Sequence, residues 1–200
     1  MFPIIKRFVD FTLSLLILAG LSIVFLILSL VIKLDSKGPV FFKQKRIGKG
    51  KKEFHILKFR TMKTDAPKEM PTHLLDRPDA YITPVGKFLR KTSLDELPQL
   101  INILKGDMSL IGPRPALWNQ LDLIEERDKY KANDVLPGLT GLAQISGRDE
   151  LPIALKARID GEYVEKQNPV LDSEIFVKTV FSVLRSEGVK EGTDISNKNS

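Results

Sequence analysis

Residues 11–32 read FTLSLLILAGLSIVFLILSLVI, a stretch of twenty-two residues without one charged side chain. As a helix rising about 1.5 Å per residue, it would extend about 33 Å, close to the ~30 Å hydrocarbon core of a bilayer. A cleaved signal peptide is the main alternative, but the apolar run is long for one and lacks a small-x-small cleavage site after it. The stretch therefore predicts a membrane-inserted segment at the start of the chain.

Basic residues flank this segment on both sides. Lys6 and Arg7 precede it, and Lys33, Lys37, Lys43, Lys45 and Arg46 follow it. Because basic flanks prefer the cytoplasm, a simple span leaves one flank on the wrong side, whereas a helix that enters and returns keeps both inside. Gly20 and Ser22 are suitable bend positions, since glycine weakens a helix and serine can bond to freed carbonyls. A re-entrant helix and a straight anchor both stay open from these residues.

The composition limits the chemistry of the rest of the chain. Two hundred residues without an internal repeat predict one domain with its own core. The absence of cysteine excludes a disulfide framework, a thiolate zinc site and a cysteine nucleophile. A net charge of +6 favours polyanionic partners, which include nucleic acid, an anionic membrane surface and phosphorylated metabolites.

A basic β-hairpin is predicted directly after the membrane segment. Two short strands over 40–46 and 53–60 flank a turn at 48–50. Six of the ten residues in 43–52 are Lys or Arg, and beside a bilayer each would attract anionic headgroups by about 1 kcal/mol. Some of these lysines would simply be solvated in a turn.

The second strand carries two cations of more specific interest. Lys58 and Arg60 alternate with apolar residues, so one strand face could direct charge toward a pocket. His55 and His73 are too isolated for a metal site, and we expect both to be structural or surface residues.

A proline-containing loop and a short helix come next. Residues 64–82 have no sustained periodicity and are predicted to form a loop, which would be suited to act as a lid. Thr83 and Pro84 are typical of a helix cap and first position, and they predict a short helix ending near Lys91. That helix would bring Arg90 to the carboxylates that follow.

The stretch SLDELPQLINILKGDMSLIGPRP, residues 93–115, contains the strongest chemical signal. Asp95 and Glu96 are adjacent carboxylates with Arg90 just before them and Arg114 after them. This arrangement is suited to a metal ion and an anionic, phosphate-bearing substrate.

The same carboxylates also fit a purely structural pattern. Ser93 and Glu96 match a capping box at a helix start, but Pro98 then falls past the first turn, whereas with Asp95 as the cap it is tolerated. In either register the helix over 97–104 would begin at the carboxylates. Its dipole and free N–H groups would then lower the pKa of the aspartate and keep it ionised.

Six ordered motifs extend this pattern over nearly the whole chain. They are KRFVD (6–10), FFKQKRIG (41–48), ILKFRTM (56–62), TSLDELPQLINILKGDMSLIGPRP (92–115), PGLTGLAQISGR (137–148) and SEGVKEG (186–192). Through them the chain resembles the bacterial sugar transferases, specifically the small monotopic phosphoglycosyl transferases that start capsule, O-antigen or glycoprotein glycan assembly on polyprenol phosphate.

The resemblance implies an α+β fold, mainly α, with an N-terminal re-entrant membrane helix, a small β-hairpin and several amphipathic and catalytic helices. Residues 1–36 would be inserted in the membrane, and 37–200 would form a catalytic domain in one folding unit with it. That domain would lie on the cytoplasmic face of the bacterial inner membrane. Relatives usually have Ser-Pro at the helix break, whereas this chain has Ser22-Ile23, so the angle of its break is open.

The reaction implied by the resemblance has two steps. Asp95 attacks the β-phosphate of a UDP-sugar, expels UMP and becomes a phosphosugar ester, which undecaprenyl phosphate then attacks. Glu96, with Asp95, would hold Mg²⁺ against the diphosphate. Resemblance to the small enzymes of the family favours an N-acetylated donor sugar, such as an N-acetylated 6-deoxy sugar. Downstream glycosyltransferases are the expected protein partners, and no nucleic acid is expected.

Further site residues follow from the matched motifs. Arg114 and Arg148 would bind phosphate through their guanidinium forks, and Arg90 and Lys58 would complete the basic shell. Gln144 could bind sugar or metal, or cap a turn.

Two other expectations concern the rest of the chain. Amphipathic stretches at 116–131, 151–167 and 170–185 would pack on the domain or lie in the membrane interface. The alternative to an enzyme is a membrane-tethered nucleic-acid binder or a noncatalytic scaffold. The basic hairpin is the only feature that supports a binder. It supports one weakly, because few aromatic residues are interleaved with its charges.

Overall fold

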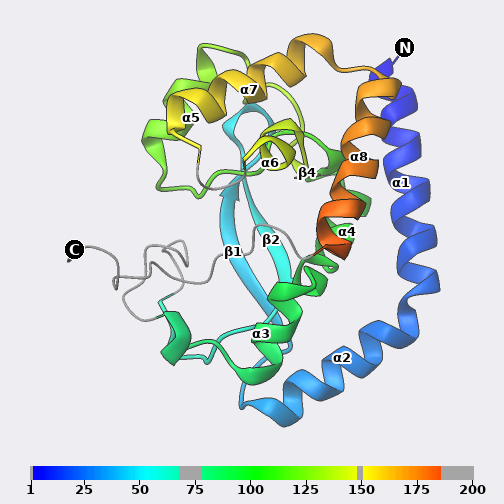
Figure 1. The fold of residues 1–200 in the computed structure, drawn as a ribbon, viewed down its shortest axis with the longest axis vertical. Helices are drawn as coiled ribbons and strands as arrows, with labels where there is room; N and C mark the ends of the chain where they lie inside the picture. Colours follow the sequence, from blue (N-terminus) through cyan, green and yellow to red (C-terminus); the bar gives the residue numbers. More distant parts are fainter. Residues whose placement is uncertain (1, 68–77, 148–150, 186–200) are drawn as a thin grey trace.

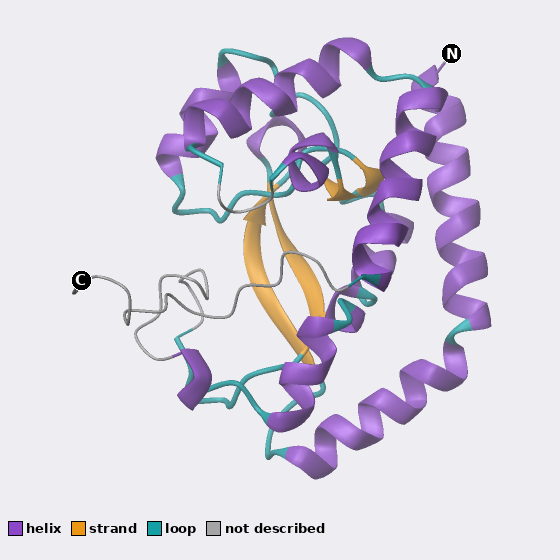
Figure 2. Cartoon of the chain, in the orientation of Figure 1, coloured by secondary structure: helices purple, strands orange, loops and turns teal. Residues whose placement is uncertain are grey.

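The computed structural model describes residues 2–67, 78–147 and 151–185, and Figures 1 and 2 show their arrangement. The helices are α1 (Phe2–Gly20), α2 (Ser22–Asp35), α3 (Pro84–Lys91), α4 (Gln99–Lys105), α5 (Leu121–Asp128), α6 (Leu142–Ser146), α7 (Ile153–Lys166) and α8 (Pro169–Leu184). The strands are β1 (Phe41–Ile47), β2 (Glu53–Phe59), β3 (Ser109–Ile111) and β4 (Gly138–Thr140). The described residues also contain three short 3₁₀ turns, η1 (Lys49–Lys51), η3 (Pro78–Ala80) and η4 (Leu94–Glu96). This agrees with the predicted α+β class dominated by helices.

The N-terminal apolar segment is two helices joined at a bend. α1 and α2 meet at Leu21 with an angle of 63° between them. Gly20 and Ser22 flank the bend, so the position predicted for a break is confirmed, and one straight helix is not formed even without proline. In the described residues no single helix is long and apolar enough to cross a bilayer, whereas this bent pair is by length and composition.

Three polar side chains of α1 fasten it to the rest of the molecule. Arg7 donates to two carbonyls at the C-terminal end of α4, at 2.6 and 3.1 Å. Asp10 is buried and accepts hydrogen bonds from a hydroxyl and a backbone amide of β3, at 2.7 and 3.1 Å. Lys6 forms a 2.6 Å ion pair with Asp172 of α8. The motif KRFVD therefore docks the first helix onto two other helices and a strand.

The hairpin runs through the middle of the molecule, between α2 and α3 at one end and α5 to α7 at the other (Figure 1). β1 and β2 pair antiparallel with Phe41 opposite Phe59, which confirms the predicted hairpin. Arg60, directly after β2, is buried and donates to the carbonyls of the C-terminal end of α2 and the turn after it. Gly38, at φ +130°, makes room for it, because a Cβ there would lie 2.0 Å from the Arg60 guanidinium.

Two apolar clusters form most of the core. One joins α4, β2 and β3 to α7 and α8 through Leu100, Ile103, Met108, Tyr163 and Ile175, among others. The other joins α2 to the hairpin and α3 through Leu28, Ile32, Phe59 and Leu89. Because α2 shares this second cluster, the apolar N-terminal segment packs directly against the part of the chain that carries the candidate site.

The C-terminal helices follow the predicted amphipathic stretches with one correction. The first stretch, 116–131, is helical only over α5, because its start pairs with the hairpin: Leu117 forms a bridge with Arg46. α8 buries Ile175 while Phe181, on the same helix, is 57% exposed, so this helix both packs on the domain and presents an apolar surface.

Candidate active site

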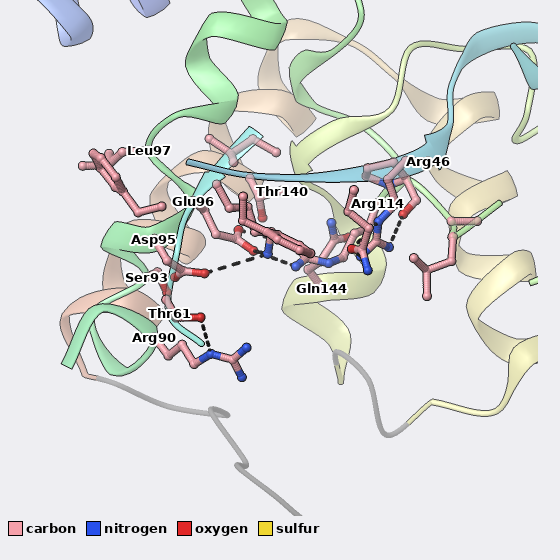
Figure 3. A pocket seen from close by; sticks show the side chains of 18 of the residues that line it. Arg46, Thr61, Arg90, Ser93, Asp95, Glu96, Leu97, Arg114, Thr140 and Gln144 are labelled. Atoms are coloured by element: carbon pink, nitrogen blue, oxygen red, sulfur yellow. Dashed lines mark hydrogen bonds and ion pairs between the residues drawn. The ribbon is translucent and has the colours of Figure 1, made fainter. Parts of the chain in front are cut away.

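A cavity of about 1420 Å³ lies between the hairpin, η4 and the helices α5 to α8. It brings together six of the predicted site residues, Lys58, Arg90, Asp95, Glu96, Arg114 and Gln144, and all of them except Lys58 are labelled in Figure 3. The seventh, Arg148, lies outside the described residues, as do His73 and the centre of the predicted lid at 68–77.

The two carboxylates project from η4, a single 3₁₀ turn between α3 and α4. Ser93 precedes it in the left-handed conformation, at φ 56° and ψ 14°, and its side chain caps no helix. The predicted capping box is therefore wrong. The helix predicted over 97–104 is present as α4, but it begins two residues later, at Gln99, with Pro98 as its cap. A left-handed residue other than glycine costs on the order of 1–3 kcal/mol, and here it turns the chain so that the carboxylates face the cavity.

Glu96 is fixed by two cations from different parts of the chain. Lys58 Nζ and Arg114 Nη2 both lie 2.7 Å from Glu96 Oε1, and Arg114 Nη1 lies 3.4 Å from Oε2. Burial opposes ionisation of this carboxyl, but the charges and hydrogen bonds of Arg114 and Lys58 outweigh burial and hold the pKa of Glu96 below its usual range. Glu96 is therefore an ionised, immobilised group.

Asp95 is buried but far less restrained. Its one ion pair among the described residues is with Lys58, whose Nζ lies 3.9 Å from Asp95 Oδ2. Burial raises the pKa of Asp95 to about 6, against the opposing charge of Lys58 and with the help of the Glu96 charge. The expected lowering of this pKa is thus wrong, because no long helix begins at the residue. Asp95 nevertheless ionises below neutral pH and keeps its oxygens available.

Two arginines border the carboxylates on different sides. Arg90 comes from α3, whose predicted cap is confirmed because Thr83 Oγ1 accepts from the amide of Gly86. Arg90 Nε donates to Thr61 Oγ1 at 2.9 Å on the Asp95 side of the cavity (Figure 3). Arg114 lies on the Glu96 side, in the loop after β3.

The loop that carries Arg114 is held by a residue that was not predicted to belong to the site. Arg46 Nη1 donates to the carbonyl of Pro115 at 3.0 Å, so a strand of the hairpin fixes the backbone next to Arg114. Arg46 stands two positions from Gln44, whose Oε1 accepts from it at 2.6 Å, and both line the cavity. The alternation of residues along β1 was the available signal for this placement.

A second feature missed by sequence reasoning is a buried ion pair at the α5–α7 end of the cavity. Arg127 donates to Asp160 Oδ2 through Nε and Nη2, at 2.9 and 2.6 Å. Nothing in the spacing of these two residues, thirty-three positions apart, indicates their contact.

The described residues contain no group of three or more His, Asp or Glu side chains placed to hold a metal. Asp95 and Glu96 are the candidate ligands. This donor set suits Mg²⁺, because Mg²⁺ is commonly bound by one or two carboxylates together with water and substrate phosphates. Two carboxylates are too few for a cation that takes all its ligands from the protein.

Comparisons with known proteins find relatives over most of the chain. The family model of the bacterial sugar transferases matches residues 1–186. The uncharacterized sugar transferase EpsL of Bacillus subtilis is 41% identical over 193 residues, which cover 96% of this chain and 94% of that protein. A UDP-glucose:undecaprenyl-phosphate glucose-1-phosphate transferase of Caulobacter vibrioides is 40% identical over 191 residues, covering 91% and 70%. An undecaprenyl-phosphate galactose phosphotransferase of Salmonella typhimurium is 37% identical over 199 residues, covering 92% of this chain and 41% of that protein. The chain belongs to the bacterial sugar transferase family.

Proposed function

We propose that this chain transfers a sugar-1-phosphate from a UDP-sugar to undecaprenyl phosphate and releases UMP. Relatives named for transfer of glucose-1-phosphate or galactose phosphate to this lipid support the reaction class. Family membership and the charged cavity leave the alternative of a noncatalytic binder or scaffold without support. An N-acetylated donor sugar stays a proposal from sequence resemblance.

The observation that carries the mechanism is the unequal treatment of the two adjacent carboxylates. Glu96 is held by two cations at 2.7 Å, whereas Asp95 has only a 3.9 Å ion pair and ionises near pH 6. A nucleophile needs a free oxygen lone pair, and an electrostatic anchor needs fixed geometry. We therefore assign the nucleophile to Asp95 and the anchoring role to Glu96.

In the first step an Asp95 oxygen forms a bond to the β-phosphorus of the UDP-sugar. The bond from that phosphorus to the oxygen bridging the two phosphates breaks, and its electron pair leaves with UMP. In the second step an oxygen of undecaprenyl phosphate attacks the same phosphorus, and the Asp95 carboxylate is regenerated. Lys58 and Arg114 stabilise the negative charge of the diphosphate throughout.

Mg²⁺, held by Glu96 and Asp95 together with the diphosphate, would offset charge on the leaving phosphate. The protein groups alone bring two carboxylates toward a substrate that is itself an anion. Lys58 and Arg114 are already engaged with Glu96, so part of their charge is neutralised before the diphosphate arrives.

The lipid acceptor requires that the site lie at a membrane, and the bent helix pair supports this. Its exposed apolar side chains include Ile4, Phe8, Leu16, Ile23, Leu26, Leu30 and Leu34. We propose that α1 and α2 form a re-entrant element in the bacterial inner membrane, since basic residues lie at both ends and both ends are docked to one catalytic unit on the cytoplasmic side.

The test is UMP release without an acceptor. The full chain in detergent, incubated with Mg²⁺ and a panel of UDP-sugars, should release about one UMP per enzyme and gain the mass of one phosphosugar. Asp95→Asn should abolish both signals, while Asp134→Asn, at an exposed aspartate, should keep them. Normal turnover by Asp95→Asn, or turnover without an adduct on the wild type, would show that the covalent mechanism is wrong.

A further inference from the structure

Gln144, on α6, has a buried side-chain amide that the structure leaves unused. Neither Oε1 nor Nε2 has a hydrogen-bond partner in the described part of the chain, and both atoms are inaccessible to solvent. Buried polar groups are almost always paired, so such an exception requires an explanation. The amide is also closely confined, because a Cβ at Gly141 would lie 3.0 Å from its Oε1.

A second glutamine supplies the comparison that gives this observation meaning. Gln99, at the start of α4, is likewise buried with both amide atoms unpartnered. Gln99 is not among the described residues that line the substrate cavity, whereas Gln144 is. Of the two residues, only Gln144 lines space that a ligand can fill, so its amide is the one that a rotation of the side chain can bring to a ligand.

The direction of the reaction decides which part of the ligand reaches Gln144. In phosphoryl transfer the attacking and leaving oxygens lie roughly in line through the phosphorus. With Asp95 as the nucleophile, UMP must leave from the side of the β-phosphorus that lies opposite Asp95. In Figure 3 that side holds Arg114 and Gln144, with Asp95 and Arg90 on the other. The leaving nucleotide, rather than the sugar, therefore extends toward α6.

The chemistry of the two groups matches. The uracil edge presents an N3–H donor beside carbonyl acceptors, and a glutamine amide presents an acceptor beside donors in the same plane. A paired contact of this kind resembles the bidentate reading of base edges by Asn and Gln. We propose that Gln144 recognises the uracil of the donor nucleotide, with Oε1 accepting from N3–H and Nε2 donating to a neighbouring carbonyl. This inference rests on the proposed function.

The role predicts a measurable preference. A site whose buried polar groups are completed by a ligand discriminates strongly against an analogue that lacks the matching group. 3-Methyl-UMP keeps the phosphate, ribose and ring of UMP but has a methyl group in place of the N3 proton. Loss of the N3–H hydrogen bond, which leaves the buried Oε1 unpaired against a methyl group, corresponds to roughly tenfold in affinity.

The experiment is calorimetric titration of the full chain, in detergent with Mg²⁺, with UMP and with 3-methyl-UMP. The wild type should bind UMP at least about tenfold more tightly. Gln144→Leu should bind the two nucleotides equally, with an affinity near that of the wild type for 3-methyl-UMP. Gln99→Leu, which removes the other unpartnered amide, should retain the full preference. Thermal unfolding of each variant checks that it is folded.

Three results would overturn the inference. They are equal binding of both nucleotides by the wild type, a full preference in Gln144→Leu, or a change in Gln144→Leu confined to discrimination between acetamido and hydroxyl donor sugars. The wild-type comparison needs no variant, so the inference can fail even if Gln144→Leu does not fold. If the wild type binds UMP without preference but still releases UMP from a UDP-sugar, only this inference fails. If it neither binds UMP nor releases it from any UDP-sugar, the proposed function fails first.

Discussion

Two clusters of charged side chains in this molecule both combine basic residues with carboxylates, but they differ in role. Arg127 and Asp160 join α5 to α7 with side chains 4% and 1% exposed. In the Glu96 cluster, Lys58 and Arg114 remain 17% and 36% exposed and border the cavity. Both border the cavity, but the first is a closed pair of one cation and one anion that is almost inaccessible, whereas the second gathers two adjacent carboxylates and several cations that stay partly exposed. Burial of charge marks a functional site only where the charges are left accessible.

Because of this difference, the two clusters should also contribute differently to stability. A desolvated pair is strongly destabilising when one partner is removed, because an uncompensated charge stays buried. Burial raises the pKa of Asp160 even beside Arg127, which shows how incompletely this pair offsets its own desolvation. The Glu96 cluster can exchange partners with water or substrate, so removing one cation there should affect the reaction more than the fold.

The largest predicted effect is therefore on stability, at the closed pair. Asp160→Ala should lower the free energy of unfolding by about 3–5 kcal/mol, since Arg127 would remain buried without its partner. Denaturant or thermal unfolding in detergent measures this. The double variant Arg127→Met with Asp160→Leu should recover most of the loss, because it removes both charges. An unchanged midpoint in Asp160→Ala would mean that solvent reaches this pair and that the two clusters do not differ as described.

At the open cluster the effect should fall on activity instead. Arg114→Met removes a fork that contacts both oxygens of Glu96, and the rate of UMP release should fall by about 10²–10³-fold. The unfolding midpoint should change little, because Arg114 is partly exposed and Lys58 still neutralises Glu96. Arg114→Lys should give an intermediate rate, since it keeps the charge but loses the fork. A loss of stability as large as that of Asp160→Ala would identify Arg114 as a structural residue.

Replacing Asp95 should change stability less than Asp160→Ala does, and in the opposite direction. A folded pKa near 6, above the usual value of 3.8, means that the stabilising contribution of the protonated group is lost as pH rises through about 4 to 6. Asp95→Asn should therefore unfold at a higher temperature than the wild type at pH 7 in chelator, by roughly 2–4 °C for each kcal/mol relieved. The gap should narrow toward pH 4. A gap of the same size at both pH values would show that ionisation of Asp95 is not its cause.

Much of the architecture could be read from local signals. The cap at Thr83, the hairpin around residues 48–50 and the break between Gly20 and Ser22 all follow from backbone preferences of a few neighbouring residues. Such preferences act over one turn of chain, and at these three places packing does not override them.

The failures arise where long-range contacts compete with a local pattern. Ser93 and Glu96 match the capping-box pattern in the sequence. In the structure, Ser93 instead adopts a left-handed turn, and Glu96 forms ion pairs with Lys58 and Arg114. Arg60 lines the cavity, but its guanidinium donates to carbonyls at the end of α2 and just after it, which the pattern of the strand did not predict. No local pattern reports partners that lie tens of residues away.

The smallest predicted effect uses α7 itself to sharpen the comparison. Glu162 stands two residues from Asp160 on the same helix, but its partner Lys166, at 2.7 Å, is 64% exposed and Glu162 is 48% exposed. An exposed pair spaced four residues apart gains little, because water screens both charges and the side chains lose rotamer freedom. Lys166→Met should shift the unfolding midpoint by less than about 2 °C, and raising the salt concentration should erase the difference. Two ion pairs of similar length, each with its acid on α7, would then differ in effect mainly through burial, which is the property that also separates the closed pair from the open cluster.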